Sequence, residues 1–395
     1  QPIKPVISNL KIRGSWGLVG NDATNAGRFA YMEDLVLGGS DSYTTGIRQD
    51  TYYSGPSWNR YFNPDLTWEV GEKINLGLDL QLFNDFNLTF DTFREKRRDI
   101  FMTRENSIPE IVGTGETKIT SNNGEMENKG LDLAIDYNKQ ITKDFFLSFK
   151  STLTFARNKV LKMDEPPYFE YPGLSDVGHP LGTYWGYVAD GLFPDQETID
   201  NSPRQDLGYT PQPGDIKYVN QPNAKGEYDN VINSNDRVAI GHPYDPELVY
   251  GFGPSMKWKN WDFSFFFQGV ARTSFMMYGM HPFGTTSIKN MLQFVADDHW
   301  SVDNPNPNAA YPRLTKDSNG NNDQYSTYWL RNAAFLKLKN AEIGYTYKGM
   351  RFYLSGVNLL TFSPFKHWDP EMGGGNGLYY PTQRVFNIGF QMTIQ

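Results

Sequence analysis

The final stretch of the chain, Arg384 to Gln395, reads RVFNIGFQMTIQ, and its residue pattern decides the fold. Every second residue is apolar, and the residues between them are polar without charge, or glycine. The apolar set is Phe386, Ile388, Phe390, Met392 and Ile394. Because successive side chains of a strand point to opposite faces, this period of two predicts a β-strand with one apolar and one polar face. We expect this strand to close a membrane barrel.

The same alternation recurs along the chain and predicts ten strands with the terminal one. The other nine are expected at 10–18, 70–82, 86–90, 131–137, 145–155, 248–258, 261–267, 336–347 and 352–359. In the last two, the apolar residues change parity once, near Lys339-Asn340 and around Gly356. One inserted residue produces such a change, so a β-bulge is predicted at each place.

The connections between these strands alternate in length. Four are predicted to be tight, at Asn84-Asp85, 138–144, Lys259-Asn260 and Lys348-Gly349. The five others are long and cover 20–63, 94–124, 157–247, 271–332 and 361–383. Short turns at one end and long loops at the other are typical of an up-and-down outer-membrane barrel, whose long loops are extracellular. The strand-like segment Tyr184 to Phe193 would break this parity, so it is assigned to the 157–247 loop.

The distribution of charge separates a membrane barrel from a soluble sandwich. A Lys or Arg that faces lipid at mid-depth costs about 2–4 kcal/mol. On the apolar parity the charged residues are Glu72, Arg94 and Lys129, all towards the long-loop ends, whereas the opposite parity carries many Lys, Arg and Asp residues. Aromatic residues also gather beside the four tight turns, where an interfacial girdle is expected. These patterns predict an all-β, antiparallel transmembrane barrel.

Composition excludes several other classes of protein. The 395 residues include no cysteine, so disulfides and thiolate metal sites are excluded. The formal charge of -8 and the lack of basic runs argue against nucleic-acid binding. No HExxH, P-loop or nucleophile-elbow motif is present. The five histidines all fall in predicted loops, three of them before proline: His179, His242, His281, His299 and His367. The sequence therefore predicts that the protein is not an enzyme.

Eight motifs carry a resemblance to a known family. In chain order they are LKIRGSWGLVGN (10–21), NPDLTWE (63–69), NGEMENKGLDL (123–133), PLGTYWGYVADGLF (180–193), FLKLKNAEIGY (335–345), SGVNLLTF (355–362), WDPE (368–371) and YYPTQRVFNIGF (379–390). Together they resemble the SusC/RagA-type TonB-dependent outer-membrane transporters, in the order found in that family. The resemblance covers nearly the whole chain, residues 1–395, but only the C-terminal part of such a transporter.

The resemblance implies an architecture and a set of partners. Members of the family have a 22-stranded barrel filled by an N-terminal plug, and nothing in this chain resembles the plug. Ten strands cannot close that barrel, so the missing strands and plug are expected upstream, on another chain or removed from this one. By resemblance, the protein is expected to lie in the lipid bilayer of the outer membrane of a Bacteroidota-type Gram-negative bacterium. It would import an oligosaccharide or peptide with a SusD-like lipoprotein, driven by the TonB complex through the plug.

Substrate contact is expected from aromatic and acidic residues of the long loops. Aromatic faces stack on sugar rings, and carboxylates accept hydrogen bonds from hydroxyls or amines. The candidates are Trp300, Trp329, Trp185, Asp190, Trp368 and Asp369. Trp300 and Trp329 lie outside the family motifs and are the better candidates for specificity, whereas the other four also suit a structural role.

Two alternatives remain open on sequence grounds. A calcium ion is one, with Asp229, Asn233 and Asp236 as ligands, although these residues lack the tight spacing of oxygen ligands that a calcium loop needs. No other cofactor is expected. The second alternative concerns function: a non-transporting surface adhesin or glycan-binding β-protein could use the same barrel wall.

Overall fold

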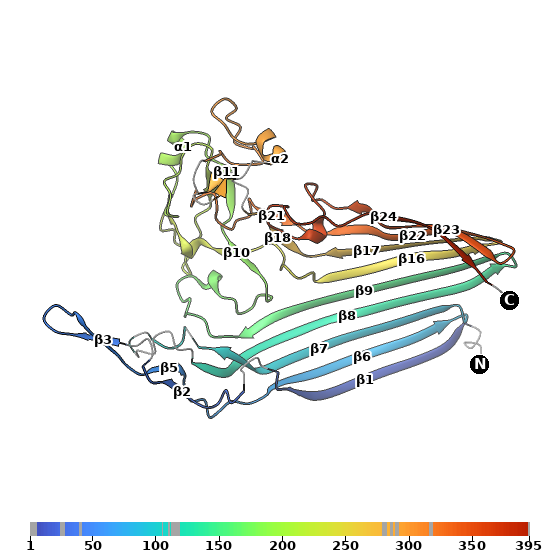
Figure 1. Ribbon diagram of the computed structural model, residues 1–395, viewed down its shortest axis with the longest axis horizontal. Coiled ribbons are helices and arrows are strands. Elements are labelled where there is room, and N and C mark those ends of the chain that lie inside the picture. The colour runs from blue at the N-terminus through green and yellow to red at the C-terminus, as the bar shows by residue number, and fades with distance from the viewer. Residues whose placement is uncertain are drawn as a thin grey trace.

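The computed structural model describes residues 6–23, 28–38, 42–104, 106–109, 111, 119–278, 283–284, 287–288, 292–315 and 319–393. His281 and Ile394 fall outside these ranges. The main element is a ten-stranded antiparallel sheet in which the strands pair in chain order (Figure 1). The strands are β1 (Ile7–Asn21), β6 (Glu69–Leu82), β7 (Phe86–Thr103), β8 (Thr120–Thr142), β9 (Phe145–Lys162), β16 (Leu248–Trp258), β17 (Trp261–Ala271), β22 (Phe335–Tyr347), β23 (Met350–Phe362) and β24 (Val385–Met392). The predicted ten-stranded antiparallel wall is confirmed.

Tight turns join the strands at one end of the sheet, and the start of β1 and the end of β24 lie at that end (Figure 1). Backbone conformation explains how the turns fit. Lys348 has φ 47° and Gly349 has φ 82°, so the two-residue turn between β22 and β23 has the left-handed conformation that such a hairpin requires. In the turn between Leu82 and Phe86, Asn84 is also left-handed, with φ 62°. One predicted turn was too long: β8 continues to Thr142, which leaves two residues in place of 138–144 before β9.

Several predicted loops were also too long. The strand β7 runs to Thr103 and β8 begins at Thr120, so about half of the predicted 94–124 loop is strand. The strand β9 likewise continues to Lys162, beyond the predicted boundary at 157. These extensions are charged but well paired. Arg94 Nε lies 2.5 Å from Glu127 Oε1 on the neighbouring strand, and cross-strand ion pairs of this kind let a polar segment stay in the sheet.

Both predicted bulges are confirmed. The pairing of β22 with β23 shifts register between Leu338 and Asn340. On β23 the irregularity falls at Asn358, which has φ 55°, two residues after Gly356. Relative to β17, β22 carries the extra residue Lys339, which explains why the apolar parity of β22 changes there.

The apolar residues form continuous rows across the sheet. Nearest the tight turns, six aromatic residues pair from strand to strand: Phe145, Trp258, Trp261, Tyr345, Phe352 and Phe390. Two residues further along each strand, an aliphatic and aromatic row follows: Leu147, Met256, Phe263, Ile343, Leu354 and Ile388. Ile388 is 90% exposed, so this face is not buried by the chain itself. An apolar band bordered by an aromatic girdle is the outer surface of a membrane barrel.

The opposite face of the sheet is polar, and its charges pair across strands. The Arg13 guanidinium lies 2.9 Å from an Asp79 carboxylate oxygen and 2.8 Å from one of Asp91. Arg351 in the same way contacts both Asp262 and Glu342. This polar face is the inner side of the wall, since barrel interiors carry the polar residues.

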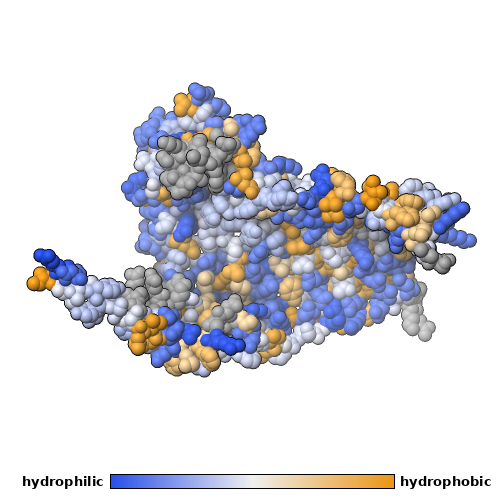
Figure 2. Space-filling view, viewed as in Figure 1, coloured by the Kyte–Doolittle hydropathy of each residue, from blue (hydrophilic) through white to orange (hydrophobic). Residues whose placement is uncertain are grey.

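The long connections after β9 and β17 fold together into a lobe at the end of the sheet opposite the tight turns (Figure 1). We call residues 184–240 and 274–332 the lobe, as far as they are described. Its paired elements are β10 (Tyr184–Gly186) with β15 (Val238–Ile240), β11 (Ala189–Leu192) with β13 (Ile216–Tyr218), β12 (Arg204–Gln205) with β14 (Val231–Ile232), and β18 (Ser274–Met276) with β21 (Leu330–Asn332). The visible surface of the lobe is mainly hydrophilic (Figure 2).

The lobe has its own hydrophobic core, which includes Ile216, Ile232, Phe275, Trp300 and Trp329. Its helices, α1 (Gln196–Asp200) and α2 (Gln293–Asp297), are short. Within the described ranges, no helix is long and apolar enough to cross a membrane. As predicted, the segment from Tyr184 to Phe193 lies outside the ten-stranded sheet and belongs to the lobe.

The first long connection forms a separate arm, seen at the lower left of Figure 1. It contains β2 (Asp34–Val36) paired with β5 (Ser57–Arg60), and β3 (Ser42–Thr45) paired with β4 (Thr51–Ser54). A further short hairpin joins β19 (Phe283–Gly284) and β20 (Ser287–Ile288). These small sheets are built from loop residues and leave the ten-stranded wall uninterrupted.

Candidate functional site

The connection between β23 and β24, which we call the 363–384 loop, folds over the polar face of the sheet. Lys337 of β22 pairs in register with Gln268 and Thr361, which places its side chain on that polar face. Its Nζ lies 2.6 Å from Asp369 Oδ2 and 2.5 Å from Glu371 Oε2. Lys337 is fully buried. The WDPE segment is therefore held against the inner side of the wall by this Lys337 cluster, defined as Lys337, Asp369 and Glu371.

A run of glycines brings the same loop against the lobe. The Gly375 N–H donates to the Met276 carbonyl at 2.8 Å, and the Tyr278 N–H donates to the Gly375 carbonyl at 3.1 Å. At Gly374, a Cβ atom would overlap the Met276 carbonyl oxygen. Only glycine allows this approach of the two backbones. The loop and strand β18 consequently form one continuous surface.

A pocket lined by five tyrosines opens where the loop meets the lobe; we call it the tyrosine pocket. Its volume is about 300 Å³, at the small end of the range for ligand sites. The lining consists of Tyr184, Tyr244, Tyr278, Tyr325 and Tyr379, together with Met276, Met372, Gly373 and Gly374. Among the described residues that line it, none is charged. The five tyrosines lie far apart in sequence, in the three connections between β9 and β16, between β17 and β22, and between β23 and β24, so only the folded protein assembles the pocket.

Two tyrosines of the pocket, Tyr184 and Tyr278, have a raised pKa. Burial raises the pKa of Tyr184 to about 12. A side-chain hydrogen bond with Tyr379 is the main reason that the pKa of Tyr278 is also raised. A phenol in this state both donates and accepts a hydrogen bond. The pocket therefore offers flat apolar ring faces with neutral hydrogen-bonding groups between them.

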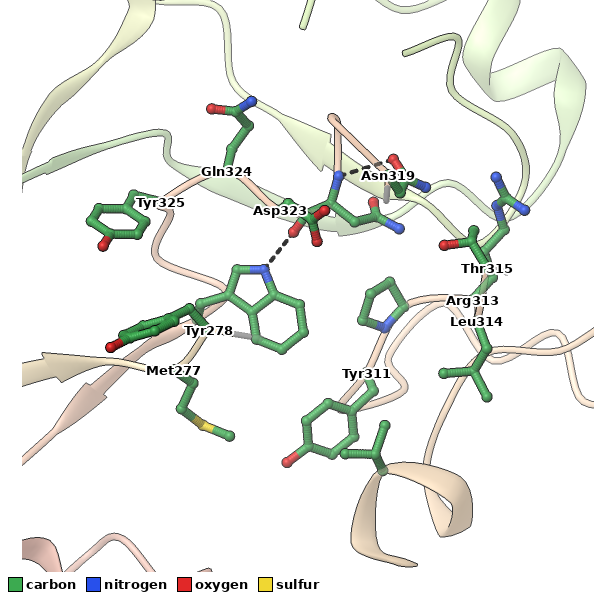
Figure 3. A pocket seen from close by; sticks show the side chains of 14 residues that line it. Met277, Tyr278, Tyr311, Arg313, Leu314, Thr315, Asn319, Asp323, Gln324 and Tyr325 are labelled. Carbon is green, nitrogen blue, oxygen red and sulfur yellow. Dashed lines mark hydrogen bonds between the residues drawn. The ribbon is translucent and has the colours of Figure 1, made fainter. Parts of the chain in front are cut away.

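A second cavity of about 150 Å³ adjoins the tyrosine pocket, and Tyr278 and Tyr325 line both. Figure 3 shows these two tyrosines on one side of the cavity and Arg313 with Leu314 on the other. The charge of Arg313 is already paired, because its Nε lies 2.7 Å from Oδ1 of the fully buried Asp215. The cavity thus extends the pocket into the lobe core.

Comparison with known proteins shows the family to which the chain and its ten-stranded sheet belong. Residues 24–359 match the family model described as TonB dependent receptor-like, beta-barrel. The chain belongs to this family. It is 28% identical to TonB-dependent receptor P26 of Formosa agariphila over 97% of its own length, which is 40% of that relative. It is also 28% identical to the TonB-dependent receptor SusC of Bacteroides thetaiotaomicron, over 98% of the chain and 38% of SusC.

A solved structure gives the same fold. The RagAB peptide transporter structure matches 98% of this chain with a TM-score of 0.71 at 22% identity, and the match covers 41% of that chain. The chain therefore spans about 40% of the length of the relatives it matches. The resemblance drawn from the motifs, to the C-terminal part of a TonB-dependent receptor barrel of the SusC type, is confirmed.

Within this TonB-dependent receptor, the six predicted substrate residues do not line one common pocket, and one of them lines the cavity. Trp329 borders the 150 Å³ cavity, and its Nε1 donates to the Asn322 carbonyl at 2.7 Å. Trp300 is buried in the lobe core over Gly214. Trp185 donates to Asp176 at 2.7 Å. Their role in binding substrate stays a prediction.

The three remaining candidates make structural contacts. Asp190 lies 2.8 Å from Lys217 Nζ on the lobe surface. Trp368 donates to the Gly373 carbonyl at 2.9 Å, beside the tyrosine pocket. Asp369 belongs to the Lys337 cluster and also accepts a hydrogen bond from Thr382. Trp368 and Asp369 therefore hold the loop that carries Tyr379.

The calcium candidates are near one another, but their oxygens already have partners. The Asp236 carboxylate accepts hydrogen bonds from the backbone N–H groups of Gln221 and Asn233. The Asn233 side chain caps the next turn, and Asp229 accepts from the Val231 N–H. Across the described part of the chain, no group of three or more His, Asp or Glu side chains could hold a metal. Calcium binding here stays a prediction.

Sequence reasoning missed the tyrosine pocket. The chain contains 24 tyrosines, and the five that meet here share no spacing; Tyr184 and Tyr379 lie in two different family motifs, and the other three lie in none. One signal was available: the MGGGNG run at 372–377 shows that some backbone must approach closely there. It indicates a close contact without identifying the partner.

Proposed function

We propose that the full-length protein imports an oligosaccharide or a peptide across the outer membrane, with energy from the TonB complex. The family assignment and the apolar outer face of the sheet support this proposal. SusC, a TonB-dependent receptor by name, and the RagAB structure, described as a peptide transporter, are the relevant relatives. The observation that carries the proposal is the aromatic and aliphatic rows on one face, with ion pairs on the other.

The proposal includes the partners and location expected from the sequence. A plug and further strands would complete the barrel and provide the contact to TonB. A SusD-like lipoprotein would cover the extracellular end, where the lobe and the arm lie. The location would be the outer membrane of a Bacteroidota-type bacterium, with the long loops at the cell surface. The protein would act as a transporter without enzymatic activity of its own.

Growth of engineered strains tests the proposal. Strains lacking this gene or lacking TonB function would be grown on single polysaccharide digests and on peptide digests. We expect both strains to lose growth on the same carbon source, because uptake needs both the barrel and the energy source. A gene deletion without effect on any of these sources, with the protein present on the wild-type surface, would refute transport.

The alternative is a surface adhesin or glycan-binding protein that does not transport. The tyrosine pocket is the observation that keeps it open, because binding alone would use the same surface. The two proposals differ in their dependence on TonB. An adhesin would hold its ligand at the cell surface equally well in cells without TonB, whereas a transporter would move the ligand inside only when TonB is present.

A further inference from the structure

We propose that the tyrosine pocket binds an uncharged sugar ring, so that the imported substrate is a neutral oligosaccharide. This inference rests on the proposed transport function and makes its cargo specific. It depends on three properties of the pocket: its tyrosine rings are exposed, its hydroxyls are neutral hydrogen-bonding groups, and the backbone around it already has hydrogen-bond partners.

The rings are available to a ligand. Four of the five tyrosines, Tyr244, Tyr278, Tyr325 and Tyr379, are between 48% and 57% exposed, although the backbone around them is fixed. Large rigid aromatic side chains provide contact area at a small cost in conformational entropy. A pyranose ring presents a flat face of C–H groups that packs on such a surface. The pocket therefore matches the apolar face of a sugar.

The polar groups match the other part of a sugar. Each tyrosine hydroxyl donates one hydrogen bond and accepts others, as each sugar hydroxyl does. The hydroxyls of Tyr184 and Tyr278 are neutral at physiological pH, as phenols ordinarily are, and their raised pKa values keep them neutral at higher pH too. The described lining contains neither a cation for a uronate or sulfate group nor a carboxylate for an amine. An acidic glycan would lose hydration there without gaining an ion pair.

A peptide fits the pocket less well. Extended peptides commonly bind by adding a strand to an exposed edge. Here the backbone is already engaged: Gly375 pairs with Met276 and Tyr278, the Tyr325 carbonyl accepts from the Tyr187 N–H, and the Tyr244 N–H donates to Gly182. Rings and hydroxyls are what the pocket offers, and these groups recognise a sugar better than a peptide backbone.

The binding test uses the full-length transporter in detergent, with any lipoprotein that co-purifies. The probes are arrays of neutral glucan, mannan, xylan and galactan oligosaccharides, matched uronic-acid and sulfated oligosaccharides, and a tryptic peptide mixture. We expect neutral oligosaccharides to bind. Their affinity should be unchanged between about 50 and 500 mM salt, because no charge pair contributes.

Variants locate the site. Tyr278→Ala and Tyr379→Ala should each weaken binding of the neutral oligosaccharide about tenfold, and Tyr278→Phe should weaken it less because the ring remains. Tyr380→Ala is the matched control, since Tyr380 is 80% exposed on the same loop and does not line the pocket. Unchanged hydrogen exchange of the lobe would show that the variants stay folded.

Several outcomes would overturn this inference. These are binding of acidic glycans or peptides alone, no binding of any neutral oligosaccharide, or wild-type affinity in both alanine variants. TonB-dependent uptake of a peptide would overturn the sugar assignment while leaving the proposed transport function intact. Loss of TonB dependence for every cargo would instead count against transport itself.

Discussion

Lys337 shows how one residue can organise a loop. Its side chain is fully buried between Asp369 and Glu371, whereas Lys339 contacts Glu371 and is partly exposed. Lys337→Met would leave two carboxylates without their buried partner, and breaking a buried pair costs about 3–5 kcal/mol. We expect amides of residues 363–384 to exchange much faster in this variant. Lys339→Met is the control, and equal exchange in the two variants would show that Lys337 has no special role.

The same cluster predicts a pH dependence. Burial raises the pKa of Asp369 and of Glu371, but the interactions with Lys337, together with Thr382 at Asp369 and Lys339 at Glu371, outweigh it, and both pKa values are lowered. The stability that the cluster provides is therefore complete above the unfolded-state pKa values, about 3.9 for Asp and 4.3 for Glu. It is lost as the pH falls further, through the folded-state values.

Hydrogen exchange of the 363–384 loop, corrected for the intrinsic effect of pH, would measure this loss. Protection should be constant from pH 7 to about pH 5 and should fall below about pH 4. In Lys337→Met the pH dependence should be weaker, because both ion pairs of Lys337 are absent and only the Lys339–Glu371 pair remains. Protection in the wild type that increases on acidification would contradict the assignment.

At the scale of elements, the contact between the 363–384 loop and β18 depends on Gly374. Gly374→Ala would push a methyl group into the Met276 carbonyl oxygen and separate the two backbones. Overpacking of this kind costs about 1–3 kcal/mol, and the tyrosine pocket should lose its shape and its affinity for ligand. Gly17→Ala on β1 is the control, because a Cβ there meets nothing within 4 Å. Equal ligand affinity in the two variants would refute this role.

Elements also show the extent of sequence-based prediction. Strands such as β24 were predicted from the period of two, because a face in lipid must be apolar at every second residue. The ends of β7, β8 and β9 were not predicted, because beyond the lipid both faces are polar and the alternation disappears. There, charge pairs between strands, such as Arg94 with Glu127, hold the sheet together.

The candidate site was harder to predict than the wall for a physical reason. The tyrosine pocket depends on contacts between stretches nearly 200 residues apart, from Tyr184 to Tyr379, and no local period marks such contacts. The tryptophans and aspartates chosen from loop chemistry mostly pack or pair within the protein, as Trp300 does in the lobe core. The aromatic and acidic loop residues chosen from the sequence are therefore not the residues that line this pocket.

On the scale of the whole molecule, the central claim is that the apolar face of the ten-stranded wall meets lipid. The aromatic row from Phe145 to Phe390 and the adjacent row from Leu147 to Ile388 define the orientation of the wall in the membrane. The polar face, with Arg13 and Arg351 in ion pairs, then faces the interior. The tyrosine pocket lies on that inner side, where the 363–384 loop meets the lobe. This is the end of the sheet opposite the tight turns, where a ligand would enter in the proposed function.

Spin labels along β24 test this claim most directly. The chain contains no cysteine of its own, so single cysteines at 386 to 391 can be labelled in the full-length protein in bilayers, with any cysteine elsewhere replaced. The account predicts high accessibility to oxygen and low accessibility to a polar nickel reagent at Phe386, Ile388 and Phe390. It predicts the reverse at Asn387, Gly389 and Gln391. Accessibility that does not alternate along the strand, or that alternates in the opposite phase, would contradict it.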